Sequence, residues 1–223
     1  MQWEDIGYLL AKNTYNENSI IIEAFTLDHG KCTGIVYGGA SRKQKKNFQI
    51  GNNMYINWRS KGENRSGYFY IELIKPITPL FFDDKKKTVC IQSACSILKI
   101  LLPERQVNKK IYNSFQNMLD SLNKKDWILE YIEWELFLIK ELGFGVNIFN
   151  LKDSNELLKK NIIINDKSFA IPKILFNKMN KKISNIDIIE ALNFNKNLLI
   201  ENFINPNRLK FPLFRNILTK YYN

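Results

Sequence analysis

Positively charged side chains are the first candidates for chemistry, because they gather at the end of a glycine-rich stretch. Between residues 26 and 46, glycines punctuate two short apolar runs that end in four cations within five residues. Lysine and arginine neutralise the phosphates of a polyanion, so an exposed basic loop here is expected to bind such a backbone. An ordinary solvated charge run is the alternative. Seven cations of this loop and of the next predicted strand and turn are contact candidates: Arg42, Lys43, Lys45, Lys46, Arg59, Lys61 and Arg65.

Tyrosines accompany these cations. Tyr55, Tyr68 and Tyr70 alternate along predicted strands and are expected on an outward face next to the cations. Rings on which bases stack and cations that neutralise phosphates are the two parts of a sequence-tolerant single-strand site. Tyr68 and Tyr70 are therefore weaker stacking candidates. The alternative is that these residues are present because tyrosine is a good strand former.

Catalytic residues are not indicated by the sequence. His29 is the only histidine, and it precedes Gly30 in a predicted turn, where a glycine with positive φ is favoured. The chain has no Gly-x-Ser-x-Gly elbow, phosphate-binding loop or paired-histidine metal helix. Its carboxylates are scattered, whereas a nuclease ordinarily clusters them around metal ions. We therefore expect no catalytic residues, and an enzyme acting on nucleic acid is the least favoured alternative.

The three cysteines indicate neither a metal site nor a disulfide framework. Cys90 and Cys95 lie five residues apart on a predicted helix and match no zinc or redox spacing, so both are expected in the core. An odd number of cysteines and the lack of a hydrophobic leader favour a reducing cytoplasm. No apolar run reaches the roughly 20 residues that span a bilayer. We expect a soluble protein with no metal, no cofactor and no membrane partner.

The net charge of +11 and the pI of about 9.4 indicate an acidic partner, with nucleic acid first and an anionic membrane second. Part of this charge is expected from AT-rich codons, which favour Lys, Asn and Ile. Residues 1–77 hold 10 Lys and Arg against 7 Asp and Glu, and residues 78–223 hold 23 against 15. Most of the positive excess therefore lies in the second part of the chain.

The elements that must position these candidates begin with strands. Three β-branched and aromatic runs bounded by turn residues are predicted strands: residues 19–27, 53–59 and 67–73. In the last run the side chains alternate, with Phe69, Ile71 and Leu73 on the core face. Four or five short strands separated by frequent turn signals favour a small closed barrel, because an open sheet would leave long edges exposed.

Prolines 76 and 79 end the strand pattern and mark the expected boundary between a barrel domain, residues 1–77, and a helical domain, residues 78–223. Three- and four-residue apolar spacing predicts helices over residues 88–102, 111–122, 127–142, 186–192, 198–204 and 214–222. Gly143 and Gly145 terminate the third of these helices. Its aromatic residues Trp127, Tyr131 and Trp134 are expected in the core rather than at a ligand site. Residues 161–171 predict two short strands about an Asn-Asp turn.

Several motifs follow one another in a recognisable order. In the first part they are Trp3-x-Asp5-x-Gly7, Glu17-x-Ser19, Thr26-x-x-His29-Gly30, Gly34-x-Val36-x-Gly38-Gly39-Ala40-Ser41-Arg42, Gln49-x-Gly51 and Trp58. In the second part they are Leu101-Leu102-Pro103-Glu104-Arg105, Tyr112, Tyr131-x-x-Trp134-Glu135, Leu142-Gly143-Phe144-Gly145-Val146 and Pro212-x-x-Arg215. By their order and spacing, these motifs resemble the RecO family of bacterial recombination mediators over most of the chain.

This resemblance implies an α+β protein with an N-terminal OB-fold barrel, a C-terminal α-helical domain and no catalytic activity. RecO-like proteins bind single- and double-stranded DNA and anneal complementary strands. They contact the acidic C-terminal tail of single-strand binding protein and act with RecR, and where it is used RecF, so that RecA is loaded. The resemblance therefore implies DNA contacts for the seven cations and two tyrosines named above. It also implies a cytoplasmic, nucleoid-associated protein of DNA repair and recombination.

One departure from the family concerns a small insertion, expected here at residues 146–185. Many relatives carry four cysteines in a zinc-finger-like hairpin, whereas Leu151 stands where the first cysteine would, and the other three are also missing. We expect this insertion to be metal-free. Apolar side chains would hold it instead: Ile162, Ile164, Phe169 and Ile171.

An adaptor that grips the acidic tail of single-strand binding protein, without a strong DNA site of its own, is the rival hypothesis. It is favoured by the larger charge excess in the helical part. Three cations near a helix start are the candidate contacts for such a tail: Arg105, Lys109 and Lys110.

Overall fold

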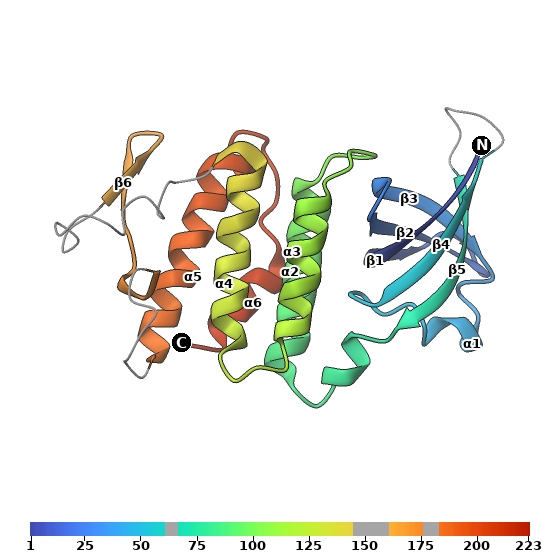
Figure 1. Cartoon of the computed structure of the whole chain (residues 1–223), viewed down its shortest axis with the longest axis horizontal. Coiled ribbons are helices and arrows are strands. Elements are labelled where there is room, and N and C mark those ends of the chain that lie inside the picture. The colour runs from blue at the N-terminus through green and yellow to red at the C-terminus, as the bar shows by residue number, and fades with distance from the viewer. Residues whose placement is uncertain (61–66, 145–160, 176–182) are drawn as a thin grey trace. The chain divides into compact units, whose positions relative to one another are not determined.

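The computed structural model describes residues 1–60, 67–144, 161–175 and 183–223 (Figure 1). The chain forms two compact units, Met1–Asn113 and Ser114–Asn223. The first unit holds the strands of the predicted barrel, and the second holds helices and a hairpin.

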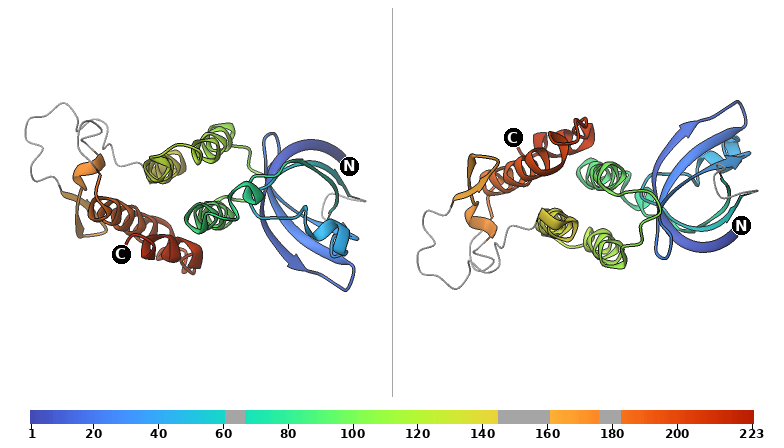
Figure 2. Two further views of the ribbon diagram at one scale, coloured as in Figure 1. Left: turned by 90° about the horizontal axis from the view of Figure 1, so that it is seen from below. Right: turned by 90° about the horizontal axis from the view of Figure 1, so that it is seen from above.

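Five strands of the first unit close into a barrel, as predicted. They are β1 (Gln2–Thr14), β2 (Ser19–Thr26), β3 (Gly30–Tyr37), β4 (Asn53–Arg59) and β5 (Gly67–Lys75). The order around the barrel is β1-β2-β3-β5-β4, and β1 pairs with β4 to close it. All neighbours are antiparallel except β3 and β5, which run parallel. The strands surround one apolar core (Figure 2), and the arrangement is OB-fold-like.

Side-chain alternation in β5 shows how the sequence builds this core. Phe69 and Ile71 are buried, and Leu73 packs against the core from its margin. The intervening Tyr68 and Tyr70 are 37% and 62% exposed. Because the pleat places alternate residues on opposite faces, the predicted inward and outward sets of this strand are confirmed.

The basic stretch after β3 differs from the predicted loop, because residues Arg42–Lys45 form the one-turn helix α1. Ser41 caps this turn by accepting a hydrogen bond from the Gln44 backbone N–H at 3.4 Å. Phe48, which follows the turn, is buried in the barrel core. The cap and the anchored aromatic ring shape the segment locally, so four consecutive polar residues adopt a helical turn.

Asn52 connects the barrel to the segment that follows it. Its side chain is buried, and Oδ1 accepts from the backbone N–H groups of Ile77 and Thr78 at 3.0 and 3.3 Å. Nδ2 donates to the Asn47 carbonyl at 3.0 Å. Asn52 thereby fixes the start of the short helix η1 (Thr78–Phe81) against the beginning of β4.

Helix α2 (Lys85–Leu101) belongs to the first unit and begins three residues before the predicted residue 88. Asp84 caps it by accepting from the Lys87 backbone N–H at 3.1 Å, which explains the earlier start. Cys90 and Cys95 are fully buried in its core face, as predicted. Strand β5 ends at Lys75, but the compact unit continues through α2 to Asn113. The domain boundary at residues 77/78 stays a prediction.

Helix α3 (Lys109–Ser121) begins in the first unit and ends in the second. Its first turn is packed on the barrel through Tyr112, whose ring centroid lies 5.3 Å from Tyr8 and 5.5 Å from Phe25. The connection between α2 and α3 therefore has an element packed on the barrel at each end: α2 before it and the first turn of α3, through Tyr112, after it.

The second unit is helical. After α3 it contains α4 (Trp127–Ile139), a wider turn at Lys140–Phe144, α5 (Asn185–Leu199), a second wide turn η6 (Ile200–Ile204) and α6 (Leu213–Lys220). Helices α4 and α5 pack against each other (Figure 2). Trp127, Tyr131 and Trp134 are buried, as expected for core residues. Gly143 has φ 94° and ends the helical path, as predicted.

One helix prediction in this unit was wrong. Residues 186–192 and 198–204 were expected as separate helices, but α5 runs without a break through the polar segment between them and continues into η6. Asn195 lies in this segment and is fully buried. Its Nδ2 donates to the Ile132 carbonyl at 2.9 Å and to Glu135 at 3.1 Å. These tertiary bonds satisfy the Nδ2 group, so a residue typical of loops sits inside a helix.

The predicted hairpin is confirmed as β6 (Asn161–Ile164) and β7 (Lys167–Ala170). Asn165 and Asp166 join the strands with φ 48° and 63°, the left-handed pair of a tight hairpin turn. Lys167 forms an ion pair with Glu201 at 2.6 Å, and Asn165 donates to the Glu201 carbonyl. The hairpin is thus attached to η6 by polar contacts. The expected apolar set is half-buried or buried: Ile162, Ile164, Phe169 and Ile171.

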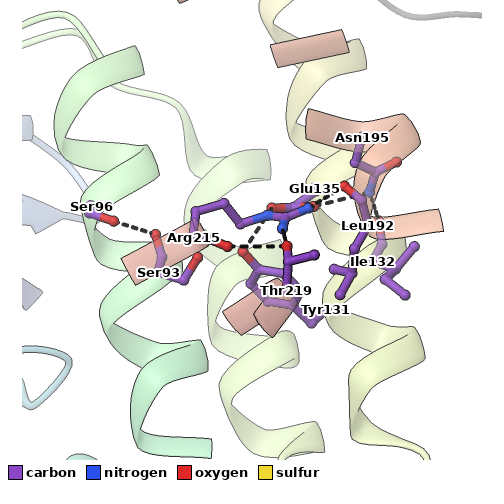
Figure 3. Close-up of polar contacts among 9 residues, drawn as sticks. All are labelled: Ser93, Ser96, Tyr131, Ile132, Glu135, Leu192, Asn195, Arg215 and Thr219. Atoms are coloured by element: carbon purple, nitrogen blue, oxygen red, sulfur yellow. Dashed lines mark hydrogen bonds and ion pairs between the residues drawn. The ribbon is translucent and has the colours of Figure 1, made fainter. Parts of the chain in front are cut away.

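A buried charge network joins α4, α5 and α6 (Figure 3). Arg215 of α6 and Glu135 of α4 have no exposed side-chain surface and pair in a bidentate fashion, Nε to Oε1 at 2.5 Å and Nη2 to Oε2 at 3.0 Å. The remaining donors of Arg215 reach Thr219 Oγ1 and the Leu192 carbonyl, each at 2.7 Å. Tyr131 donates its hydroxyl to Glu135 at 2.7 Å. The pair is therefore surrounded by hydrogen bonds, as a buried ion pair requires.

Candidate nucleic-acid interface

The predicted basic residues occupy two separate places on the barrel. Arg42 and Lys46 are exposed in and just after α1, in the connection from β3 to β4. Lys43 and Lys45 belong to the same helical turn. Arg59 is exposed at the end of β4. Lys61 and Arg65 lie outside the described residues.

Arg59 and Tyr68 do come together. They are direct partners across the β4–β5 pair, so both project from the outer face of the barrel. Tyr37, at the end of β3, lies beside them with its ring centroid 6.1 Å from that of Tyr68. Tyr37 is 67% exposed and was not among the predicted residues. Its alternation in β3 was the available signal, but the parallel β3–β5 pairing that brings it to Tyr68 is not visible in the sequence.

Tyr70 is exposed, but it lies among carboxylates. Its hydroxyl donates to Glu72 Oε1 at 3.0 Å, and this hydrogen bond raises the pKa of Tyr70. Next to β5, Asn57 of β4 donates to Glu4 of β1 at 2.7 Å, and the hydrogen bond between Glu4 and Tyr55 of β4 raises the pKa of that phenol. This part of the face therefore presents negative charge, which opposes a phosphate backbone. The Arg59, Tyr68 and Tyr37 cluster suits DNA better than Tyr70 does.

A second aromatic cluster lies where β1 starts and β4 ends. The indole of Trp3 stacks on the His29 ring at 4.1 Å and on Trp58 at 5.6 Å, with interplanar angles of 9° and 15°. The Arg105 guanidinium lies 5.7 Å from the centroid of Trp58. All four residues belong to the first compact unit.

Asp5 holds the histidine of this cluster. Its carboxylate is almost fully buried and accepts from His29 Nδ1 at 2.9 Å, and also from the backbone N–H groups of Asp28 and His29. His29 was predicted only as a turn residue, and the turn is present, with Gly30 at φ 70°. The stacking and the bond to Asp5 are additional, and the bond joins residues 24 positions apart in the sequence.

The three cations proposed for an acidic tail have different surroundings. Lys109 pairs with Asp28 at 2.6 Å, and this hydrogen bond raises the pKa of the lysine. Arg105 is exposed beside Trp58, and Lys110 is exposed on the first turn of α3. Lys109 is thus engaged by a carboxylate of the chain itself, while Arg105 lies at the aromatic cluster.

Two sequence-family models match this chain in order. The model described as "Recombination protein O N terminal" matches residues 1–77, and "Recombination protein O C terminal" matches residues 83–171. The chain belongs to the RecO family. The "DNA repair protein RecO" of Cereibacter sphaeroides is 34% identical over 148 residues, which are 66% of this chain and 62% of that protein. The protein of the same name from Wolbachia pipientis is 33% identical over 150 residues, 66% of this chain and 61% of its own length.

The matched part of the chain thus spans a little over three fifths of these RecO relatives. A solved structure of an asparaginyl-tRNA synthetase from Entamoeba histolytica aligns over 95% of this chain and 59% of that one. Its TM-score of 0.29 and identity of 9% are too low to indicate a shared fold. None of the described helices has the length and apolar character to cross a membrane. In the described ranges, no three His, Cys, Asp or Glu side chains converge on a position for a metal ion.

The RecO motifs meet in three dimensions at the aromatic cluster. Asp5 of the first motif receives three hydrogen bonds from the turn that contains the Thr26-x-x-His29-Gly30 motif. Thr26 Oγ1 donates to the Gly30 carbonyl at 3.0 Å and accepts from the His29 N–H. Residues of two RecO motifs therefore build one turn beside the aromatic cluster. Neither motif alone indicates that the two meet there.

Proposed function

We propose that this chain is a DNA-binding recombination mediator that acts in DNA repair without catalysing a reaction. Membership of the RecO family, whose curated relatives are named as DNA repair proteins, supports this role. The observation that carries the DNA contact is the exposed basic and aromatic surface of the barrel, with Arg42 and Lys46 at α1 and with Arg59, Tyr68 and Tyr37 on β4, β5 and β3. Cations and stacking rings together bind single strands with little sequence preference.

In this proposal the protein binds single- and double-stranded DNA and anneals complementary strands. It contacts the acidic tail of single-strand binding protein, acts with RecR and, where it is used, RecF, and helps RecA load. Its place would be the cytoplasm, at the nucleoid. These partners are inferred from the family and not from contacts in the chain.

The test is a salt series of DNA affinity, because each phosphate contact that is lost flattens the dependence of log K on log salt by about 0.7 for a single strand. We expect Arg42→Ala/Lys46→Ala to lower the slope of oligothymidylate binding by about 1.4. The matched control, Lys85→Ala/Lys125→Ala, removes two exposed cations elsewhere and should leave the slope unchanged. An unchanged slope in the first variant would remove α1 from the site.

The adaptor is the second candidate, and the charge distribution favours it. Residues 78–223 carry a net charge of +8 against +3 for residues 1–77, so an acidic peptide has more positive charge to meet in the second part. A labelled acidic peptide that binds while oligothymidylate does not would select the adaptor. Annealing of complementary strands coated with single-strand binding protein, accelerated by this protein, would select the mediator.

A further inference from the structure

A cavity of about 470 Å³ opens beside the aromatic cluster. Its walls come from the start of β1, the β2–β3 turn, the start of β3, the end of β4 and the segment after α2, and they include Trp3, His29, Thr33, Trp58, Arg105 and Val107. This volume is in the range of small-molecule and cofactor sites. Because every lining residue belongs to Met1–Asn113, the cavity lies within one compact unit.

The rings of this cavity are held in place by the fold. Trp58 is 5% exposed and forms part of the barrel core, and Trp3 packs against that core from outside. His29 completes a nearly parallel stack on the other side of Trp3. A planar ligand therefore meets rings whose orientation is already set, which lowers the entropy cost of stacking.

Polar groups surround the rings. Asp5 binds His29 through Nδ1, and within the described ranges the second ring nitrogen, Nε2, makes no hydrogen bond. Asp28, whose carboxylate pairs with Lys109, and Thr33, whose hydroxyl donates to Glu104, also line the cavity. Hydrogen-bonding groups beside aromatic rings match the edges of a nucleobase, and the His29 Nε2 is available for such an edge.

Arg105 has an unusual backbone at the mouth of the cavity. Its φ of 58° is left-handed, a conformation that costs free energy for a residue other than glycine, and such strain is found at ligand sites. The segment is held there by the Arg105 N–H, which donates to the Lys31 carbonyl at 2.8 Å, and by Glu104, which accepts from Thr33 Oγ1. The exposed guanidinium is thus fixed beside Trp58, where it can meet a phosphate next to a stacked ring.

We propose that this cavity takes one unstacked nucleobase of a single DNA strand, stacked on the partly exposed His29 ring that Trp3 supports from behind, with Arg105 on a neighbouring phosphate. The inference rests on the proposed DNA binding and names a base-reading position within it. It differs from the surface at α1, which contacts backbone only.

The experiment compares oligothymidylate with an oligonucleotide of equal length in which abasic residues replace the nucleotides. Both carry the same phosphates, but only the first carries bases. We expect wild type to prefer the first. Trp3→Leu removes the ring that holds His29 in the stack, so it should weaken binding of the first about tenfold, the loss of one stacked base, with abasic binding unchanged. Tyr15→Leu, which removes an exposed ring elsewhere on the barrel, should change neither.

Arg105→Ala provides a second variant, because alanine keeps the left-handed strain while the guanidinium is lost and the side chain is exposed. It should weaken binding of both oligonucleotides, whereas the matched control Lys85→Ala should not. A single 5-iododeoxyuridine in the oligonucleotide, photocrosslinked to the full chain, should yield crosslinked peptides that contain Trp3 or His29. Where Trp3→Leu fails to fold, Arg105→Ala and the crosslink decide.

The outcomes separate the two proposals. Salt-dependent DNA binding without preference over the abasic strand, with crosslinks outside the cavity, would overturn the base position and leave the proposed function standing. Loss of all DNA binding by wild type would overturn both. If an acidic peptide ending in phenylalanine binds, and Trp3→Leu abolishes that binding but not DNA binding, the cavity is a peptide site and the proposal is wrong.

Discussion

Replacing Arg215 with methionine should destabilise the second unit strongly. The arginine is fully buried and makes two hydrogen bonds to Glu135, with further bonds to Thr219 and the Leu192 carbonyl. Methionine removes these donors, and the Glu135 carboxylate, also fully buried, then has no cation. Breaking a buried pair by removing one partner costs about 3 to 5 kcal/mol. This is a large part of the roughly 5 to 15 kcal/mol by which domains are stable.

The double variant Glu135→Leu/Arg215→Met distinguishes the net contribution of the ion pair to the free energy of unfolding from the cost of an unpaired buried charge. Apolar residues of similar volume often replace a buried pair with little loss. The hydroxyl of Tyr131 would still lose its acceptor, a cost of about 1 to 3 kcal/mol. We therefore expect the double variant to be more stable than Arg215→Met alone, with a coupling energy between the two sites of about 2 kcal/mol or more.

Urea unfolding and hydrogen exchange measure this effect. Tryptophan fluorescence during urea unfolding mixes signals from both units, because Trp127 and Trp134 lie in the second and Trp3 and Trp58 in the first. Hydrogen exchange of peptides from residues 114–223 measures the second unit alone. Peptides from the barrel should exchange as in wild type. Lys220→Met is the matched control, since it removes an exposed cation from the same helix and should change stability by less than about 0.5 kcal/mol.

Two results would refute the reasoning. Arg215→Met within about 1 kcal/mol of wild type would mean that the carboxylate is relieved by water or by protonation at small cost. A double variant as unstable as the sum of the single variants would mean that the two side chains are energetically independent.

Two further predictions concern the first unit. Asn52→Ala leaves the N–H groups of Ile77 and Thr78 without their acceptor and should lower the free energy of unfolding by about 1 to 3 kcal/mol, measured by urea titration; a change below about 0.5 kcal/mol would contradict it. Burial raises the pKa of Cys32 from 9.0 to about 12, so its thiol should react with a disulfide reagent at pH 8 only after unfolding, and rapid native reaction would contradict this. Because the folded pKa is the higher one, the stability from this thiol is present below about pH 9 and is lost as the pH rises toward 12.

Local patterns in the sequence were enough to predict the elements. The period of two in β5 separates buried Phe69 from exposed Tyr70. The Asn165-Asp166 pair predicted the hairpin turn, because both residues tolerate positive φ. Gly143 predicted the end of the helical path at residues 140–144 for the same reason. These features depend on a few neighbouring residues, so a single sequence carries them.

The tertiary structure alone decided which residues meet. The sequence suggested one group of cations, but Arg42 lies in α1 and Arg59 at the end of β4, and the parallel β3–β5 pairing brings Tyr37 to Arg59 and Tyr68. His29 lies in the aromatic cluster beside the cavity because Asp5 of β1 binds its ring. Asn195 lies inside a helix, where its Nδ2 group donates to Glu135 from 60 residues away. Polar side chains are stable in such places only when a distant partner completes their hydrogen bonds, and local sequence contains no record of that partner.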